Sequence, residues 1–251
     1  KVTADEFAKE REKLFSEMAD FVQGDYDNIL KAMKVFPPID RVVSIGQNLE
    51  QDKDAVLPYE EAEKIIDKFE LIAVTHCYCR HEKDLLDKKC KVTDERKNCL
   101  LFGKIARFSI DNDFAKPIKQ EEAKKILAKA REDGLVHKAF HVKLDHEREE
   151  EAICNCCKCC CGTFQLYHIG AMPFHSVSSY MAKVEKDNCT SCGICEEVCP
   201  MDAIEMKNFA EVDEERCIGC GVCAYNCPQE TIVMENVGSR KVFVPPAKRK
   251  S

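Results

Sequence analysis

The sequence predicts an α+β fold in three parts: a helical N-terminal region, a cysteine-rich middle domain and a C-terminal domain built from a repeat. Apolar residues recur at helical spacing near the N-terminus. The chain of 251 residues contains 18 cysteines, and a cysteine pattern that starts at Cys189 returns at Cys217, an interval of 28 residues. We place the domains at residues 1–70, 71–182 and 183–234, followed by a basic tail over residues 235–251.

The N-terminal region is expected to begin with two helices. The first starts at Thr3, which forms the pattern of a capping box with Glu6, and it ends at Gly24. The second covers residues 27–35 and should stop before Pro37, because proline cannot continue a helix. The apolar stripe of these helices is typical of a core or a subunit interface, so an oligomer is a possible state.

The next elements carry the chain to its first cysteines. Residues 39–45 have the composition of a short strand. Residues 57–69 predict a helix with a proline in its first turn. The brief apolar run over residues 71–75 is partly β-branched and predicts a second strand.

The middle domain predicts two more helices and a strand. Asn98 is a good N-cap, so a helix over residues 99–110 is expected, and a thiolate would be favoured at its first residue. A further helix should open with Pro117 and Gln120-Glu121-Glu122 and close at Gly134. Residues 135–142 alternate like a strand, and a charged connector follows.

The repeat near the C-terminus has the spacing of iron–sulfur ligands. The pattern Cys-x-x-Cys-x-x-Cys-x-x-x-Cys-Pro occurs twice. In this arrangement three thiolates surround one cluster and the fourth reaches the other cluster of the pair. The first cluster would be held by Cys189, Cys192, Cys195 and Cys227. The second would be held by Cys199, Cys217, Cys220 and Cys223.

This repeat resembles a bacterial-type ferredoxin with two 4Fe-4S clusters. The resemblance covers about residues 183–234, including Gly193 and Gly221, which permit tight loops around the sulfurs. It implies a fold with two βαβ halves related by a pseudo-two-fold axis, and the transfer of single electrons at low potential. Zinc also binds Cys-x-x-Cys pairs, but the doubled pattern closed by Cys-Pro favours iron–sulfur clusters.

Ten cysteines lie outside the repeat. They are Cys77, Cys79, Cys90, Cys99, Cys154, Cys156, Cys157, Cys159, Cys160 and Cys161. Such crowding indicates that soft metal is being bound, and we expect one or two further iron–sulfur clusters. One tentative partition joins Cys77, Cys79, Cys90 and Cys99 in one cluster, with four cysteines of the run over residues 154–161 in another. A scheme with ligands from both regions is equally arguable. Structural zinc and a redox-active thiol centre are the alternatives.

The upstream motifs, from Cys77-x-Cys79-Arg80 to the cysteine run, resemble the upstream half of ferredoxin-domain proteins in anaerobic bacteria and archaea. The resemblance implies a multicluster electron carrier that serves a redox partner protein or an oxidoreductase subunit. Arg80 could neutralise the charge of a thiolate-bound cluster. Two rival functions stay open: a redox enzyme whose upstream cluster binds substrate at an open iron, and a module that senses oxidation or handles metal.

Charge and composition restrict the remaining functions. The formal net charge of −7 argues against nucleic-acid binding. No apolar run approaches eighteen residues, so membrane insertion is not expected. Cluster ligands need reduced thiols, which favours the cytoplasm. No Gly-x-Gly-x-x-Gly or phosphate-binding-loop pattern occurs, so the chain shows no motif for a dinucleotide or ATP and is more typical of an electron carrier than of an enzyme by itself.

Overall fold

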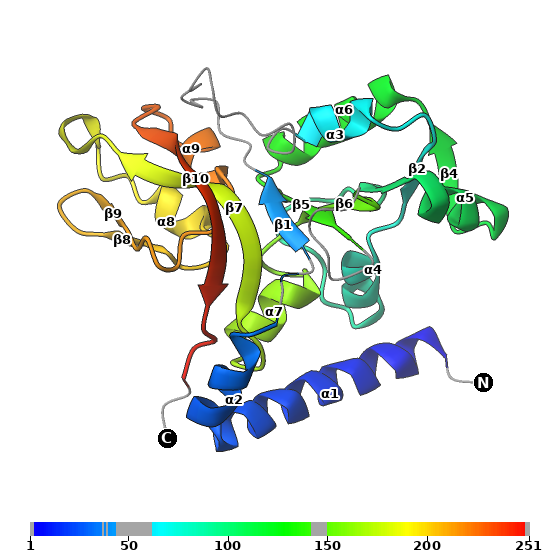
Figure 1. Cartoon of the computed structure of the whole chain (residues 1–251), viewed down its shortest axis with the longest axis horizontal. Coiled ribbons are helices and arrows are strands. Elements are labelled where there is room, and N and C mark those ends of the chain that lie inside the picture. The colour runs from blue at the N-terminus through cyan, green and yellow to red at the C-terminus, as the bar shows by residue number, and fades with distance from the viewer. Residues whose placement is uncertain (1–2, 37, 39, 44–61, 142–149, 249–251) are drawn as a thin grey trace.

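The computed structural model describes residues 3–36, 38, 40–43, 62–141 and 150–248. Figure 1 shows one long sheet in the middle, a small lobe at one end, helices at the other end, and an N-terminal helix crossing beneath. Helix α1 (Ala4–Gly24) has the predicted capping box: the Thr3 hydroxyl accepts a hydrogen bond from the Glu6 amide at 3.2 Å, and the Thr3 amide donates to Glu6 Oε2 at 2.7 Å. Helix α2 (Tyr26–Met33) follows after one turn residue.

Eight strands form the large sheet in the order β10-β7-β1-β5-β6-β3-β2-β4. Their bounds are β1 Asp40–Val43, β2 Ile72–Thr75, β3 Cys99–Phe102, β4 Ala115–Ile118, β5 Val136–Phe140, β6 Ala152–Cys156, β7 Phe174–Val184 and β10 Ile232–Val244. Neighbouring strands are antiparallel except for the pair β1 and β7. The predicted strands over residues 40–43, 72–75 and 136–140 are therefore confirmed, whereas residues 39, 44 and 45 lie outside the described part.

Two apolar cores stabilise the two ends of this sheet. At one end, α3 (Ala62–Asp67) and α6 (Gln120–Glu132) cover the sheet, with Ile65, Ile66 and Leu127 buried against it. Helices α4 (Tyr78–Leu85) and α5 (Gly103–Asp111) lie beside β2 and β3. The part of the predicted helix before residue 62 lies outside the described residues.

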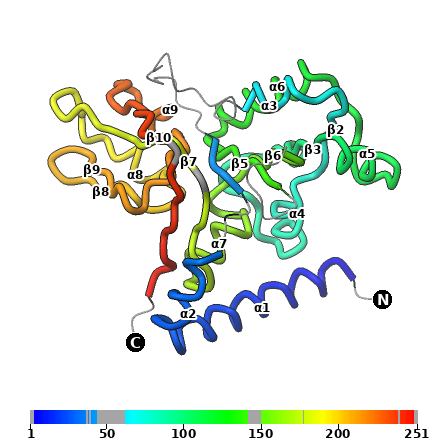
Figure 2. Tube along the Cα trace, in the orientation of Figure 1, coloured from blue at the N-terminus to red at the C-terminus, as the bar shows by residue number. Residues whose placement is uncertain are grey.

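At the other end, the chain between the long strands β7 and β10 forms a small lobe. Its elements are η1 Lys186–Asn188, α8 Ile194–Val198, β8 Ile204–Met206, β9 Ala210–Val212 and α9 Val222–Tyr225. Met201, Ile218 and Met234 are buried between this lobe and the sheet, in a core that also includes α7 (Gly162–His168). The chain trace in Figure 2 shows that β7 and β10 run continuously from the lobe into the sheet.

One helix start predicted from the sequence is wrong, and a second is right only in part. Asn98 does not cap a helix, because residues 99–102 form β3 between β2 and β6, and the helix begins only at Gly103. Pairing on both sides and burial of this apolar segment outweigh the local capping signal. Helix α6 begins at Gln120, as predicted, but Pro117 is not part of it. Pro117 lies in β4, the edge strand of the large sheet. Among the described residues, no further strand pairs with the outer side of β4, so the amide hydrogen that proline lacks is not needed for a hydrogen bond there.

The basic tail predicted over residues 235–251 is largely part of the sheet. Strand β10 continues to Val244 and pairs with β7 as far as Phe174, with Val242 and Val244 buried. Arg240 donates hydrogen bonds to the carbonyl oxygens of Tyr180 and Cys217 at 2.9 Å and 2.7 Å. The boundaries at residues 183 and 234 therefore cut through two continuous strands. Among the described helices, none combines the length and the apolar character needed to cross a bilayer.

Shortening the chain tests this correction. Ending it after Asn236 removes the outer half of β10, including Val242 and Val244, whose burial contributes about 1.5–3 kcal/mol each. We expect a protein with a clearly lower thermal midpoint or one that does not fold. Ending the chain after Lys248 is the control and should leave the midpoint unchanged. Equal midpoints for the two truncations would show that the outer half of β10 contributes no stability.

Candidate metal centres

The C-terminal lobe consists of two similar cysteine loops, each followed by a short helix. In the first loop Ser191 and Gly193 have φ of 56° and 81°, and in the second Gly219 and Gly221 have φ of 70° and 77°. These left-handed residues turn the backbone sharply just before α8 and α9 begin. Each loop therefore closes round on itself and directs its sulfurs toward a common space.

Each cysteine loop lines one of two cavities, and the fourth cysteine comes from the other half of the repeat. One cavity is lined by Cys189, Cys192, Cys195 and Cys227. The other is lined by Cys199, Cys217, Cys220 and Cys223. The structure thus brings each predicted set of four thiols to one cavity. Among the described residues, no three of these eight sulfurs lie within 4.8 Å of one another, so they are spaced more widely than the ligands of a single ion.

The two cavities differ in their exposure. All four cysteines of the second cavity are buried, whereas Cys192 of the first is exposed and Cys189 is partly exposed. Burial raises the pKa of Cys220 and Cys223. The Ala203 amide donates a hydrogen bond to Cys199 Sγ at 3.3 Å. An apolar cavity with amide donors suits a group whose negative charge is spread over several sulfurs.

Six of the ten upstream cysteines form a circle in which each thiol lies close enough to its two neighbours to shift their pKa values, and we call this set the six-thiol ring. In order around the ring they are Cys77, Cys99, Cys154, Cys156, Cys161 and Cys79, and Cys79 contacts Cys77 again. Among the described residues, no three sulfurs of the ring lie within 4.8 Å of one another, so its interior is wider than one tetrahedral ion requires.

The six-thiol ring is assembled from strands on both sides of β3. Cys154 and Cys156 alternate with Asn155 on β6, so their side chains share one face. Cys99 begins the neighbouring strand β3, and Cys77 ends the loop after β2. Hydrogen bonds from Cys79 and Cys99 lower the pKa of Cys77 to about 2, so a thiolate is readily formed there. The Gly162 amide donates to Cys79 Sγ at 3.4 Å.

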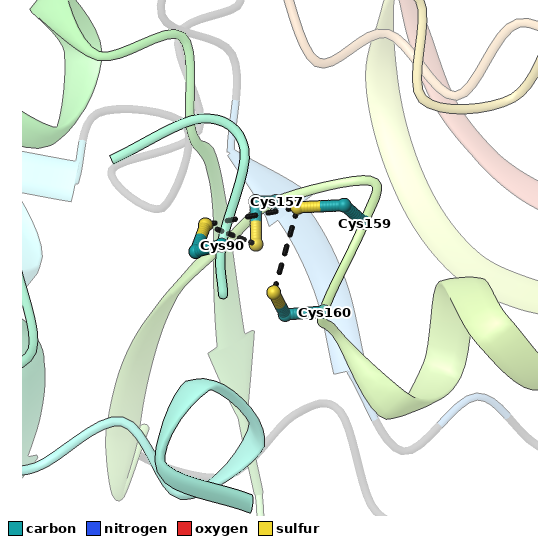
Figure 3. Close-up of side chains that lie close together, drawn as sticks. All are labelled: Cys90, Cys157, Cys159 and Cys160. Carbon is teal, nitrogen blue, oxygen red and sulfur yellow. Dashed lines mark hydrogen bonds between the residues drawn. The ribbon is translucent and has the colours of Figure 1, made fainter. Parts of the chain in front are cut away.

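The remaining four upstream cysteines, Cys90, Cys157, Cys159 and Cys160, make a second, tighter group, which we call the four-thiol group. Their sulfurs all lie within 4.8 Å of one another. Figure 3 shows the sulfurs pointing toward a common centre, with Cys90 in the loop after α4 and the other three in the turn after β6. Hydrogen bonds from Cys157 and Cys160 lower the pKa of Cys159 to about 6.

A buried arginine lies between these two sites. Arg80 on α4 is 0% exposed and donates hydrogen bonds to Asn98 Oδ1 and to the Asn155 carbonyl, both at 2.7 Å. Burial lowers the pKa of Arg80, but the negative charges of Cys77 and Cys157 raise it more, and the net shift is upward. Arg80 therefore stays charged and faces a member of each site.

A second buried cation lies beside the six-thiol ring. Lys138 on β5 is 0% exposed, forms an ion pair with Asp40, and donates to the Thr163 hydroxyl at 2.9 Å. Burial lowers the pKa of Lys138, but the charges of Asp40, Cys161 and Cys156 raise it more. The ring is consequently bordered by one positive charge on each side.

Helix α1 covers the upstream sites from outside. Arg11 forms an ion pair with Glu82 on α4 at 2.6 Å, and Lys83 pairs with Glu12 at 2.7 Å. A Cβ atom on Gly162 would lie 3.0 Å from Arg11 Nη2 and 4.0 Å from Cys79 Sγ. The N-terminal region thus helps to keep water away from the six-thiol ring.

The crosswise cavities define the C-terminal lobe as a ferredoxin-like iron–sulfur domain. Residues 188–231 match the family model of a 4Fe-4S dicluster domain. The chain matches none of the curated proteins with which it was compared. The family match and the cavity geometry together show an iron–sulfur domain with 4Fe-4S clusters.

The observed grouping of the upstream cysteines differs from the tentative partition. Cys90 does not join Cys77, Cys79 and Cys99 but lies with three cysteines of the run, so the scheme with ligands from both regions describes the geometry. Sequence reasoning also missed Lys138 and Asp40. Lys138 could have been noticed because it occupies an inward-facing position in a strand of alternating polarity. Nothing in the sequence marked Asp40.

Gly219 is a further residue that the sequence did not single out. A Cβ atom there would lie 2.1 Å from the Tyr180 carbonyl oxygen, besides the left-handed backbone that the position requires. Gly193 has the same kind of backbone, but nothing lies within 4 Å of its Cβ position. A substitution at Gly193 therefore introduces backbone strain alone, whereas one at Gly219 introduces backbone strain and a steric clash.

We therefore expect Gly219→Ala to be more damaging than Gly193→Ala. Strain alone costs about 1–2 kcal/mol in Gly193→Ala, whereas Gly219→Ala must also displace β7 from the loop that carries Cys217 and Cys220. Thermal midpoint and iron content per chain are the measurements. Equal losses in the two variants would show that β7 does not constrain this loop.

Proposed function

We propose that this chain is an electron-transfer protein or subunit that relays single electrons between its two C-terminal 4Fe-4S clusters, an upstream centre and a partner oxidoreductase. The iron–sulfur domain supports the electron-transfer role, because such clusters exchange one electron with little rearrangement of their ligands. The observation that carries the proposal is the six-thiol ring, which adds a third thiolate site beside the two crosswise cavities.

The six-thiol ring has the chemistry of an iron–sulfur ligand set. Six thiols are too many for one tetrahedral ion, and each iron of a cluster takes a terminal thiolate. Lys138 and Arg80 supply buried positive charge against the negative charge of such a group. The hydrogen bond from the Gly162 amide to Cys79 is of the kind that tunes a cluster potential.

The six-thiol ring adjoins the C-terminal lobe. Cys156 and Cys161 of the ring belong to the same apolar core as Cys199 and Cys220 of the second cavity. Lys158, in the turn after β6, forms an ion pair with Asp202 of the lobe. His168 at the end of α7 reaches the same part of the lobe, where its Nε2 lies 2.9 Å from the Pro200 carbonyl oxygen. Buried packing that is shared by the two sites supports a relay.

The exposed first cavity supports an exit to a partner at that end. Cys192 reaches the surface, and Glu196 and Glu197 beside it are exposed carboxylates. Negative charge around the exit suits a partner whose docking face is basic. We place this exchange in the cytoplasm, where thiol ligands stay reduced.

The proposal is tested on the full chain purified without oxygen. The two C-terminal clusters account for about eight iron atoms, so we expect more than eight per chain, with matching sulfide. Cys99→Ser, in the six-thiol ring, should lower iron and sulfide but leave the paramagnetic resonance of the reduced C-terminal pair. Cys223→Ser, in the second cavity, is the matched variant and should disturb that pair instead.

Two results would count against the proposal. Iron limited to about eight atoms, unchanged in Cys99→Ser, would leave the six-thiol ring without a cluster. Failure of the reduced protein to return electrons to a cationic one-electron acceptor in stopped-flow experiments would remove the electron-transfer role. We expect that reaction to be fast and to slow as salt rises, because salt screens the carboxylates near Cys192.

A further inference from the structure

The four-thiol group is geometrically unlike every other set of cysteines in the described chain. Cys90 Sγ lies 3.7 Å from Cys157 Sγ and 3.6 Å from Cys159 Sγ, and Cys159 Sγ lies 3.4 Å from Cys160 Sγ. All four atoms are within 4.8 Å of one another, a condition that no three sulfurs of the C-terminal cavities or of the six-thiol ring satisfy.

These distances match the edges of a single coordination tetrahedron. With a metal–sulfur bond of about 2.3 Å, four thiolates around one ion lie about 3.8 Å apart. In an iron–sulfur cube each thiolate binds a different iron atom, so the body of the cluster separates the sulfurs much more widely. The four-thiol group therefore has the size of one ion and is too small for a cluster.

We propose that Cys90, Cys157, Cys159 and Cys160 bind one tetrahedral metal ion, Zn²⁺ or Fe²⁺, through four thiolates and without inorganic sulfide. Four protein ligands leave no open position, which is the form of a structural site and not of a catalytic one. This inference does not depend on the proposed electron-transfer function, because the six-thiol ring and the C-terminal cavities use other cysteines.

The surrounding contacts hold the ligands in place. Gln165 Nε2 donates to the carbonyl oxygens of Cys159 and Cys160 at 3.1 Å and 3.0 Å, which fixes the turn after β6. The loop that carries Cys90 is held where the Thr93 hydroxyl donates to Asp133 Oδ2 at 2.6 Å. An ion at this point joins the loop after α4 to the turn after β6 across 67 residues of sequence.

The same ion would fix the six-thiol ring indirectly. Cys156 and Cys161 of the ring are the sequence neighbours of Cys157 and Cys160, which are ligands of the proposed ion. A single peptide bond therefore joins each of these two ring cysteines to a ligand. The Cys161 amide donates to the Cys157 carbonyl at 3.1 Å and closes the turn. The four-thiol group is thus placed to position the redox site next to it.

The test measures zinc, iron and acid-labile sulfide per chain in the anaerobically purified full chain and in Cys90→Ser. We expect wild type to hold about one metal ion in excess of the iron that sulfide accounts for, and Cys90→Ser to lose that excess. Loss of zinc identifies Zn²⁺, and loss of one iron without sulfide identifies Fe²⁺. Cys99→Ser, in the six-thiol ring, is the control and should keep that ion.

X-ray absorption of the wild-type chain provides a test that needs no variant. At the zinc edge the ion should show a single shell of four sulfurs at about 2.3 Å and no neighbouring metal. If the ion is Fe²⁺, the excess of iron over sulfide replaces this measurement, because cluster iron dominates the iron edge. Equal amounts of iron and sulfide in the wild-type chain, with no zinc, would overturn the proposal in favour of a cluster. That result would leave the electron-transfer proposal standing, whereas the outcomes that defeat electron transfer concern Cys99 and the C-terminal pair.

Discussion

The direction of successive side chains in the cysteine run over residues 154–161 determines the upstream half of this protein. On β6, Cys154 and Cys156 point to one face and join Cys99 of the next strand. The chain then leaves the strand, and Cys157 starts a turn whose thiols face Cys90. Adjacent cysteines therefore serve two sites of different size, and the turn must be rigid for either site to keep its shape.

The second organising feature is the continuity of β7 and β10. Their inner halves belong to the ferredoxin-like lobe and their outer halves to the large sheet. Arg240 at the outer half reaches back to the Cys217 carbonyl, so the ligands of the second cavity are braced by residues beyond the repeat. A ferredoxin-like lobe joined to the sheet by two continuous strands has a fixed position relative to the six-thiol ring, which a flexible linker would not provide.

Local signals made much of the molecule predictable, and long-range packing made the rest unpredictable. The capping box of Thr3 and Glu6, the alternation around Val136, and the ligand sets of the repeat depend on residues close in sequence or on a repeated spacing. The partners of Cys90 depend on the order of strands in the sheet, which no local pattern encodes. Asn98 shows the same limit, because its side chain binds Arg80 instead of capping a helix.

Buried charge explains why the thiol sites and the fold depend on each other. The hydrogen bonds that the structure gives Arg80 go to neutral oxygens of Asn98 and Asn155, so its charge must be balanced by other groups. The negative charges that raise its pKa come from cysteines of the six-thiol ring and the four-thiol group. Protonated thiols would leave the arginine buried without compensation, whereas thiolates bound to the proposed metal would keep their charge. Metal binding at the proposed sites would therefore stabilise the fold of the upstream half, since binding free energy becomes folding free energy.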